Sequence, residues 1–562
     1  MEISAKLIAA VFVAPTMFAP LSSAAARPGP VAGSTHVRHA VTTPAAPMLG
    51  EAAQRGAPAI EPQRLDIRVN VRPSLPTALI EADLTFRVTE SADSVVWFLR
   101  PDMNLDAIED EDGLPLTYRR RRSFIRVTTP TLDRGAVIKW TFRYRARFSK
   151  SLEEAGQLLL TTPWYPHLRV APDPEEFQRY VPMPMTMTST LPDPWMLVSS
   201  GTPSVTDAES GAKTFTWRDS VPSAGIPLVV GRFAEWSMLD EVGTLRGFFP
   251  PEDRSVLEPY VRYMRNAAVF FTERMGPLRR RSWNLVAVDL PDNISGLTVP
   301  GITFMQRGNV NVDDAFPLRV FGHEIAHLWW NHHVEIPRAR DAWLREGLPT
   351  YSSLLFLENE YGNQMMRLEL ERSRLVALAV DSNEALEVGF EMATPDAVYA
   401  LNYHKAAIVL HMLREIIGLD GFADLCRGLN ELREDITTDV FIREAETRYG
   451  DDLSWFFDSW LRSPDVPTFR IRYGFRQDEE HASRYRLSGT IEQSGAAIRF
   501  PALVRVPLEA APPLETTVWI EPGVTEFSIV LPSPPRDLQF DPYGVLLYRE
   551  ATVEKMDARP PG

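Results

Sequence analysis

The chain has 562 residues, of which 44% are hydrophobic and 24% are charged, and its net charge at pH 7 is −15. This length predicts several domains, and the composition is that of an ordinary globular protein with sizeable cores. The acidic balance argues against a nucleic-acid-binding protein, which would present a basic surface. The single cysteine, Cys426, excludes an intrachain disulfide.

The first residues have the pattern of an export signal. A lysine in MEISAK precedes the apolar run LIAAVFVAPTMFAPL and the small residues SSAAA, which predicts residues 1–26 as a signal peptide cleaved near Ala26. The run contains Pro15 and Pro20 and is short for a membrane span, so no stable span is expected. The predicted location is periplasmic or extracellular. The alternative is an uncleaved signal anchor that tethers the chain to a membrane.

A linker and an all-β domain are expected next. Residues 27–62 are rich in proline, alanine and glycine without periodicity, which is typical of a flexible linker. Residues 63–240 alternate apolar and polar side chains in short runs such as RLDIRVNV and ALIEADLTFRVT. This period-2 pattern predicts β-strands. The arginines of LPLTYRRRRSFIRVTT are expected at the solvated edge of a hairpin.

The pattern then changes twice. Residues 241–463 are mainly helical in periodicity: VLEPYVRYMRNAAVFFTERMG predicts an amphipathic helix that ends at Gly276, and NLVAVDL predicts a buried strand. Residues 464–552 alternate again, as in TFRIRYGF and ALVRVPLEA, and predict a small β-sandwich followed by a tail at 553–562. The predicted fold class is multidomain α+β.

The segment FGHEIAHLWWNHHVEIPRARDAWLREGLPTY carries the main chemical signal. Positions four apart share a helix face, so His323 and His327 can present two imidazoles to one metal ion, with Glu324 beside them. A catalytic zinc ion takes three protein ligands and leaves a fourth position for water. Glu346 is the candidate third ligand. Eighteen residues separate it from His327, which suits the rest of one helix, a connection through Pro337 and the start of a second helix.

Less specific interpretations of the histidines also exist. A helix can carry two histidines with ordinary structural partners and no metal ion. The pair His332 and His333 is adjacent, so its side chains point to different sides of a helix and cannot both join the site. We expect a surface or packing role for that pair.

The segment resembles the gluzincin zinc metallopeptidase family of aminopeptidase N and leukotriene hydrolase. The family pattern is H-E-x-x-H, eighteen residues, then E within W-L-x-E-G-x-x-x-Y. The sequence departs from it at Asn331 and His332, where the family usually has Gly-Asn. The residues in register are His323, Glu324, His327, Trp329, Val334, Asp341, Trp343, Leu344, Glu346, Gly347 and Tyr351.

The resemblance extends downstream to YALNYHKAAIVLHML at residues 399–413. The family has Y-x-K-G-A there, and its tyrosine stabilises the oxyanion. Tyr403 and Lys405 match, and Ala406 replaces the usual glycine. A phenol is a suitable donor for a tetrahedral intermediate, which agrees with this role. The alternative is that Tyr403 only caps or packs a helix.

The resemblance also implies an architecture. We expect an N-terminal β-saddle domain, a thermolysin-like mixed α/β zinc domain and the C-terminal β-sandwich. Larger family members add a C-terminal helical domain that covers the active site, and nothing in this sequence can supply it. A more open cleft is therefore expected, unless an oligomeric partner covers it.

One family motif is missing. Upstream of the zinc helix the family has G-x-M-E-N, whose glutamate grips the free α-amino group of the substrate. Here the residues at 295–304 are SGLTVPGITF, and the alignment puts Thr298 at the glutamate position. Threonine cannot form a salt bridge with an ammonium ion. The stretch is still expected to form an edge strand beside the substrate, with candidate substrate-binding residues Gly296, Thr298, Pro300 and Gly301.

The expected function is an exported metallopeptidase with one zinc ion per chain, acting on a peptide or protein. It is an aminopeptidase by resemblance. Zinc would lower the pKa of its water towards about 7, Glu324 would move the proton to the leaving amine, and Tyr403 would stabilise the oxyanion. The alternatives are a zinc hydrolase of a non-peptide bond, as in a family branch that opens an epoxide, and a scaffold that binds without cleaving. Intact Glu324 and Tyr403 argue against the scaffold.

Overall fold

The computed structural model describes residues 59–161, 163–169, 179–290, 294–309, 315–380, 383–432, 434–478 and 484–556. The predicted signal peptide, most of the predicted linker and the end of the predicted tail lie outside these ranges. The chain divides into two compact units. The first takes most residues before 264 together with residues 282–321, and the second takes residues 264–281 and those from 322 onward.

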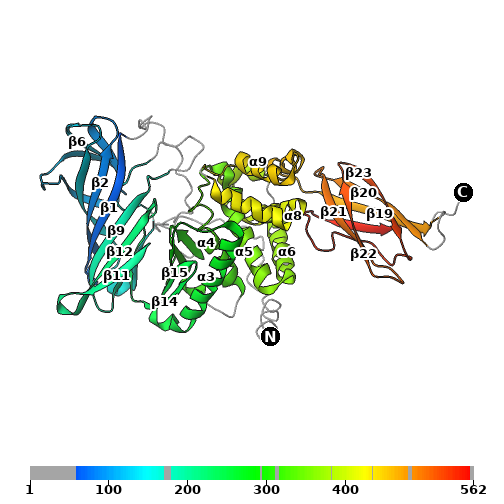
Figure 1. Ribbon diagram of the computed structural model, residues 1–562, viewed down its shortest axis with the longest axis horizontal. Coiled ribbons are helices and arrows are strands. Elements are labelled where there is room, and N and C mark those ends of the chain that lie inside the picture. The colour runs from blue at the N-terminus through cyan, green and yellow to red at the C-terminus, as the bar shows by residue number, and fades with distance from the viewer. Residues whose placement is uncertain are drawn as a thin grey trace, which may run out of the picture. The chain divides into compact units, whose positions relative to one another are not determined.

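The largest sheet of the first unit has seven strands in the order β11-β12-β9-β1-β2-β7-β4 (Figure 1). Neighbouring strands are antiparallel except β1 and β9, which are parallel. The predicted alternation appears in β1, β2 and β7, where buried and more exposed residues largely alternate. The strands are β1 (Ile60–Val71), β2 (Thr77–Val88), β4 (Met103–Glu109), β7 (Val137–Arg147), β9 (Met183–Pro192), β11 (Thr202–Asp207) and β12 (Ala212–Ser223).

Two three-stranded sheets complete the β region, in the orders β3-β6-β5 and β10-β13-β8. The predicted arginine hairpin is confirmed, because β5 and β6 pair antiparallel and Arg122 turns between them at φ 51°. Trp97 packs edge-on against Phe86 and Phe142 in the core. The elements are β3 (Ala92–Phe98), β5 (Thr117–Arg121), β6 (Phe124–Leu132), α2 (Leu152–Ala155), β8 (Gln157–Leu160), β10 (Met196–Val198) and β13 (Leu228–Gly231).

A five-stranded mixed sheet follows, in the order β14-β15-β16-β18-β17. The central strand β16 is buried at every residue, which explains why its second half, Leu285–Val288, is continuously apolar instead of alternating. Residues 234–240, which the predicted boundary assigns to the preceding β domain, form β14 and pair with β15 in this sheet. The strands are β14 (Ala234–Asp240), β15 (Gly243–Phe249), β16 (Ser282–Val288), β17 (Gly296–Val299) and β18 (Ile302–Gln306).

Apart from the short helix α2, the described α-helices lie within residues 241–463, the range for which the sequence predicts mainly helical periodicity. The amphipathic helix that was expected to end at Gly276 is α3 (Arg254–Met275), and Gly276 follows it at φ 91°. Among the described residues, no helix is both long and apolar enough to cross a bilayer. The remaining helices are α4 (Ala315–Ala326), α5 (Ala342–Tyr361), α6 (Asn363–Ala379), α7 (Pro395–Val398), α8 (Ala406–Glu431), α9 (Thr438–Tyr449) and α10 (Ser454–Phe457).

Short helical turns connect these elements. The turn η6 (Tyr399–Lys405) is a π-helix, which is wider than an α-helix, and it runs directly into α8. The other turns are η1 (Glu209–Gly211), η2 (Pro251–Asp253), η3 (Arg307–Asn309), η4 (Ala339–Asp341), η5 (Leu386–Glu391) and η7 (Asp458–Arg462).

The C-terminal strands form a four-stranded sheet, β23-β20-β19-β25, and a three-stranded sheet, β22-β21-β24. Phe469 of the first sheet packs against Phe540 of the second at 5.2 Å between ring centroids, as expected for a sandwich core. Arg374 of α6 donates to the carbonyl of Gly544 (2.8 Å) and so attaches the helices to these strands. The strands are β19 (Thr468–Gln477), β20 (Tyr485–Ser494), β21 (Phe500–Val506), β22 (Leu514–Ile520), β23 (Val524–Leu531), β24 (Gln539–Phe540) and β25 (Ala551–Lys555).

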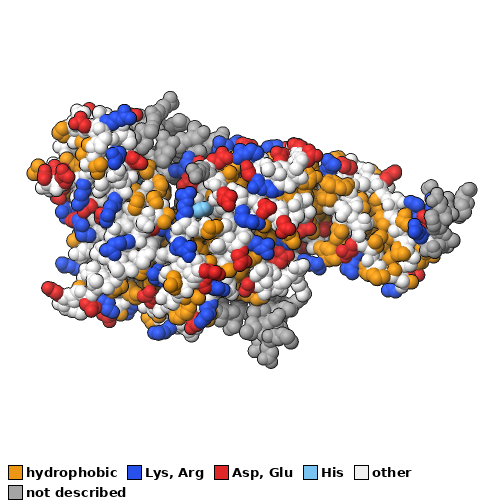
Figure 2. Space-filling model, in the orientation of Figure 1, with side chains coloured by type: hydrophobic (Ala, Val, Ile, Leu, Met, Phe, Trp, Pro, Cys, Tyr) orange, Lys and Arg blue, Asp and Glu red, His pale blue; other side chains and the backbone are white. Residues whose placement is uncertain are grey.

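Acidic and basic side chains are mixed over the face of the molecule that Figure 2 shows. On the seven-stranded sheet, Glu81 of β2 pairs with Arg68 of β1 and Arg143 of β7. The arginines are about half exposed (54% and 47%), so each pair contributes little to stability, in the range of 0–1 kcal/mol.

The approach of α5 to η6 and α8 is unusually close. A Cβ atom added to Gly347 would lie 2.7 Å from the Cβ atom of Ala406, nearer than real Cβ contacts come. Gly347 follows Glu346, and Ala406 lies three residues after Tyr403. The missing side chain of Gly347 therefore allows the candidate ligand and the candidate oxyanion donor to approach each other.

We predict that Gly347→Ala lowers the free energy of unfolding by about 1–3 kcal/mol, because overpacking of a tight contact has this cost. Ala406→Gly removes the methyl group that the new side chain would meet. The double variant should therefore recover part of the loss, although glycine itself costs up to about 1 kcal/mol in a helix. Denaturant unfolding of both single variants and the double variant measures this coupling. Strictly additive losses would show that the two positions do not meet.

Candidate metal centre and active site

Three ligand side chains converge in the second unit. Within the described residues, His323, His327 and Glu346 form the one group of three or more possible ligand side chains that could hold a metal ion. The two Nε2 atoms lie 3.1 Å apart, and each lies 3.5 Å from Oε2 of Glu346. Tetrahedral zinc with bonds of about 2.0–2.1 Å would separate its ligand atoms by roughly 3.3 Å. The three atoms therefore have the spacing that zinc requires.

The helix that carries the histidines ends sooner than predicted. His323 lies in the last turn of α4, which ends at Ala326, and the N–H of His327 still donates to the carbonyl of His323 (3.2 Å). The chain turns away at Asn331, whose φ is 82°. This left-handed conformation suits glycine best and asparagine next, so the family's usual glycine and this chain's asparagine meet the same backbone requirement.

Thr350 orients the first histidine. Its hydroxyl donates to the carbonyl of Glu346 (2.7 Å), so its oxygen is left to accept from Nδ1 of His323 (3.1 Å). A proton on Nδ1 leaves Nε2 with a free lone pair directed at the other ligands. Such partners commonly fix the ring of a metal-binding histidine. Thr350 lies four residues after Glu346 on α5, a spacing that could have revealed it in the sequence.

Asn331 orients the second histidine, His327. Its Nδ2 atom lies 2.9 Å from Nδ1 of His327 and donates to the carbonyl of Arg345 (3.0 Å). The contact fixes the ring of His327 relative to the residue before Glu346. Asn331 was noted in the sequence only as a departure from the family pattern. Because α4 ends at Ala326 and Asn331 lies in a left-handed turn, the sequence carries no regular spacing that predicts this contact.

The charges of the three ligands support one another. Burial opposes ionisation of Glu346, but hydrogen bonds and charge interactions with His323 and His327 outweigh it and hold the pKa of Glu346 well below its usual range. Burial lowers the pKa of His327, whereas the carboxylates of Glu346 and Glu324 raise it, and the net effect is upward. A carboxylate beside two imidazoles is a suitable donor set for zinc.

Glu324 and Tyr403 lie beside this centre. Glu324 is buried, 8% exposed, and its charge acts on both His327 and Tyr403, which places all three groups together. The Tyr403 ring stacks on His323 at 5.6 Å between centroids and 24° between planes. Burial, together with the charges of Glu346 and Glu324, raises the pKa of Tyr403 well above its usual value. The phenol therefore keeps its proton at neutral pH and remains a hydrogen-bond donor.

The sequence did not single out Tyr399 as part of this surface. Its ring lies 5.4 Å from that of Tyr403, and 48% of Tyr399 is exposed. An exposed aromatic side chain in contact with the candidate oxyanion donor is available to touch a substrate. The signal was the repeated tyrosine in YALNY, four residues apart.

The remaining candidate residues are not members of the ligand group. His332 and His333 are partly exposed and do not join the ligand group, and burial, followed by the charge of Arg279, lowers the pKa of His333. Thr298 belongs to the first unit, on the predicted edge strand β17, where its hydroxyl lies 3.2 Å from that of Thr303. The other candidates on this hairpin are Gly296, at the start of β17, and Pro300 and Gly301, in its turn.

Residues 308–460 match the family model of the Peptidase family M1 domain. This part of the chain is an M1 peptidase domain of the gluzincin type found in aminopeptidase N. The resemblance predicted from the sequence is confirmed, and the M1 match contains the candidate ligands His323, His327 and Glu346 as well as Glu324 and Tyr403.

Curated M1 relatives match over a limited part of their length. The chain is 25% identical to aminopeptidase M1 of Arabidopsis thaliana over 178 residues, which are 30% of this chain and 20% of the relative. It is 28% identical to aminopeptidase N of Lactococcus lactis over 160 residues, 26% of this chain and 19% of the relative. The chain thus spans about a fifth of the length of these relatives.

Solved M1 structures resemble a larger part of the chain. Aminopeptidase A of Legionella pneumophila, in complex with aspartic acid, matches 90% of this chain and 61% of its own chain with a TM-score of 0.67 and 15% identity. An M1 zinc metallopeptidase of Deinococcus radiodurans, bound to a Tyr-Ser-Ala substrate, matches 72% of this chain and 94% of its own with a TM-score of 0.55 and 20% identity. These likenesses support the fold.

We predict that Glu346→Ala weakens zinc binding on the order of 10²-fold or more, because two histidines leave the site incomplete. Zinc content after dialysis against a graded chelator measures the loss. Glu360→Ala, an exposed position on the same helix α5, is the matched control and should retain zinc. Full zinc retention by Glu346→Ala would mean that another residue is the third ligand, with His332 the next to test.

Proposed function

We propose that the chain is an exported zinc-dependent peptidase that hydrolyses peptide bonds with one zinc ion per chain. The spacing of the ligand atoms of His323, His327 and Glu346, with Glu324 and Tyr403 beside them, supports the proposal. A scaffold that only binds would need neither a buried carboxylate nor a protonated phenol at a metal centre. The M1 match and the aminopeptidase relatives support peptides as the substrate class.

The chemistry would be shared between the centre and its neighbours. Zinc held by His323, His327 and Glu346 would supply a Lewis acid. Glu324 would accept a proton from the attacking water and return it to the leaving amine. Tyr403 would donate its O–H to the oxyanion that forms on the carbonyl, and the upward pKa shift of the phenol keeps that proton in place.

We propose that recognition of the substrate N-terminus is weak. Thr298, at the position of the family's amine-binding glutamate, is neutral, 7% exposed and in contact with Thr303. Another carboxylate could bind the substrate amine in place of the missing glutamate. The candidates are Glu153 and Glu154, which precede Trp164-Tyr165-Pro166 in the sequence. Glu154 accepts from the N–H (2.9 Å) and hydroxyl (3.0 Å) of Ser151 in the capping box of α2, which reduces its availability for a substrate amine.

Export rests on the N-terminal pattern of apolar residues followed by SSAAA. N-terminal sequencing of the protein recovered from the periplasm or the medium tests it, since cleavage near Ala26 would give a mature chain that begins in the predicted linker. Recovery of an intact N-terminus in the membrane fraction would favour the uncleaved anchor instead.

Digestion of a peptide library, followed by mass spectrometry, tests the activity itself. We predict that Glu324→Gln keeps zinc and the fold but loses turnover by about 10²–10⁴-fold, because an amide cannot accept the proton. Glu335→Gln, at an exposed position in the same segment, is the control and should stay active. Full activity of Glu324→Gln would assign the base to another residue.

Tyr403→Phe should lower kcat on the order of 10²–10³-fold with a smaller change in KM, as expected when a donor acts in the transition state. The neighbouring Tyr399→Phe is the matched control, because it removes a hydroxyl from the adjoining ring, and it should keep kcat within a few-fold. Steady-state kinetics on one peptide measure both variants. An unchanged kcat for Tyr403→Phe would mean that Tyr403 has only a structural role and that another group stabilises the oxyanion.

The ratio of kcat/KM for a free peptide to that for its N-acetylated twin tests the weak anchor. We predict a ratio below about 100, because a neutral hydroxyl is worth roughly 1 kcal/mol whereas a buried ion pair is worth several. Poor activity on single amino-acid anilides should accompany it. Thr298→Glu should raise the ratio, with Thr298→Gln as the uncharged control. A wild-type ratio above about 100, near 3 kcal/mol, would require a charged anchor elsewhere.

A further inference from the structure

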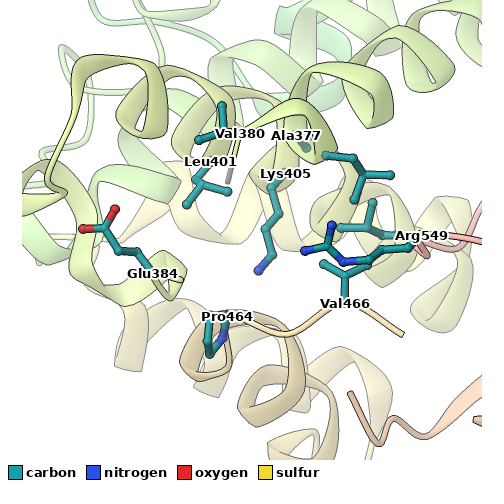
Figure 3. A pocket seen from close by; sticks show the side chains of 10 residues that line it. Ala377, Val380, Glu384, Leu401, Lys405, Pro464, Val466 and Arg549 are labelled. Atoms are coloured by element: carbon teal, nitrogen blue, oxygen red, sulfur yellow. The ribbon is translucent and has the colours of Figure 1, made fainter. Parts of the chain in front are cut away.

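A small cavity in the second unit combines two cationic side chains with apolar walls (Figure 3). It has a volume of about 20 Å³, room for about one water-sized particle. The residues that the argument uses are Leu401 and Lys405 of η6, Pro464 and Val466 before β19, and Leu547 and Arg549 before β25. The cavity thus lies between the helix bundle and the C-terminal strands, apart from the ligand group.

Lys405 is the buried cation of this cavity. The residue is 2% exposed, and Figure 3 shows its side chain extending into the cavity with the ammonium group at its tip. An ammonium group can donate three hydrogen bonds. Within the described chain, its one hydrogen bond is a long contact of 3.4 Å to the carbonyl of Ser463. Burial lowers the pKa of Lys405 to about 8, with Asp465 opposing this shift and Arg549 adding to it.

Arg549 faces the same space from the opposite side. Its guanidinium group turns towards the ammonium group of Lys405 in Figure 3. Among the residues that the structure describes, neither cation has a carboxylate within the 4.0 Å that defines an ion pair. Two acidic residues are near. Glu384 lines the cavity but accepts from the N–H of Ala393 (2.8 Å), and Asp465 is exposed to solvent.

We propose that this cavity binds one small inorganic anion, a halide such as chloride, between the ammonium group of Lys405 and the guanidinium group of Arg549. A buried charge without a partner is costly, and two like charges facing one space increase that cost. An anion would receive charge-assisted hydrogen bonds from both groups. The apolar side chains of Pro464, Val466 and Leu547 line the same space, and its volume of about 20 Å³ suits one small ion.

The anion would join two parts of the second unit that are distant in sequence. Lys405 ends η6, and Arg549 stands two residues before β25. Binding to the folded chain alone would stabilise it according to the anion concentration. The expected effect is therefore on stability, and it does not depend on the proposed peptidase activity.

Bromide is the probe, because it has the charge of chloride and scatters X-rays anomalously. Crystals of the full chain grown in sodium bromide should show an anomalous peak in the cavity, between Lys405 and Arg549. In solution, the midpoint of thermal unfolding should rise by on the order of 1–3 °C when bromide replaces gluconate, which is too large for the cavity, at constant ionic strength.

Variants assign the effect to the cavity. Lys405→Met keeps the length of the side chain without its charge and should abolish the bromide-dependent shift. Arg549→Gln, at an exposed position, should reduce or abolish the bromide-dependent shift. This variant is compared with the wild type if Lys405→Met does not fold. Lys213→Met, on β12 in the first unit and 48% exposed, is the matched control and should keep the full shift.

Two results would overturn the proposal. Density in the cavity without an anomalous signal would show that water fills it. A peak in the crystal, with a midpoint shift that is absent or equal in the wild type and the variants, would mean an adventitious ion only.

Discussion

The candidate site depends on the close approach of α5 to η6, the turn that follows α7. Glu346 and Thr350 stand on α5, whereas Tyr403 stands on η6, so the distance between the two backbones sets the distance between ligand and donor. Gly347 permits that distance because it has no side chain to meet Ala406. Asn402, next to Tyr403, also donates to the carbonyl of Gly389 (3.0 Å), which holds η6 from its other side. The positions of Glu346 and Tyr403 are thus set by backbone packing.

Burial then decides which groups are charged. Two imidazoles keep the buried carboxylate of Glu346 ionised, and this carboxylate and that of Glu324 keep the phenol of Tyr403 protonated. The charge of Glu346 therefore acts both within the candidate ligand group and on the phenol beside it. Groups that are already in their working protonation states need little reorganisation when charge develops on a substrate.

Much of this arrangement could be predicted from the sequence because it is local. The spacing of His323 and His327 is a property of a single helix, and the interval to Glu346 predicts a second helix, which begins at Ala342. The apolar run Leu285–Val288 of β16 likewise predicts burial on both faces. The same reasoning identified Tyr403 only with the help of a family resemblance, since its approach to His323 is a long-range contact.

The parts that were missed depend on tertiary structure. After α4 ends at Ala326, the chain turns through a left-handed conformation at Asn331, which this residue type permits but does not require. The pairing of β14 with β15 places residues 234–240 in a different sheet from the strands before them, although the alternating pattern is the same in both. Thr350 and Asn331 contact the candidate ligands His323 and His327. These contacts could be sought only after the ligands had been identified.

The π-helical form of η6 has a consequence for how this family can vary. A π-helical turn holds about one residue more than an α-helical turn, and each residue advances an α-helix by roughly 100°. Loss of one residue from Tyr399–Lys405 would let the segment continue α8 as a regular helix, but it would also rotate Tyr403 relative to Ala406 and the packed face of α8. The number of residues in η6 is therefore fixed by the orientation that Tyr403 needs relative to the packed face of α8. Insertions and deletions should be tolerated in the surrounding loops but not within η6.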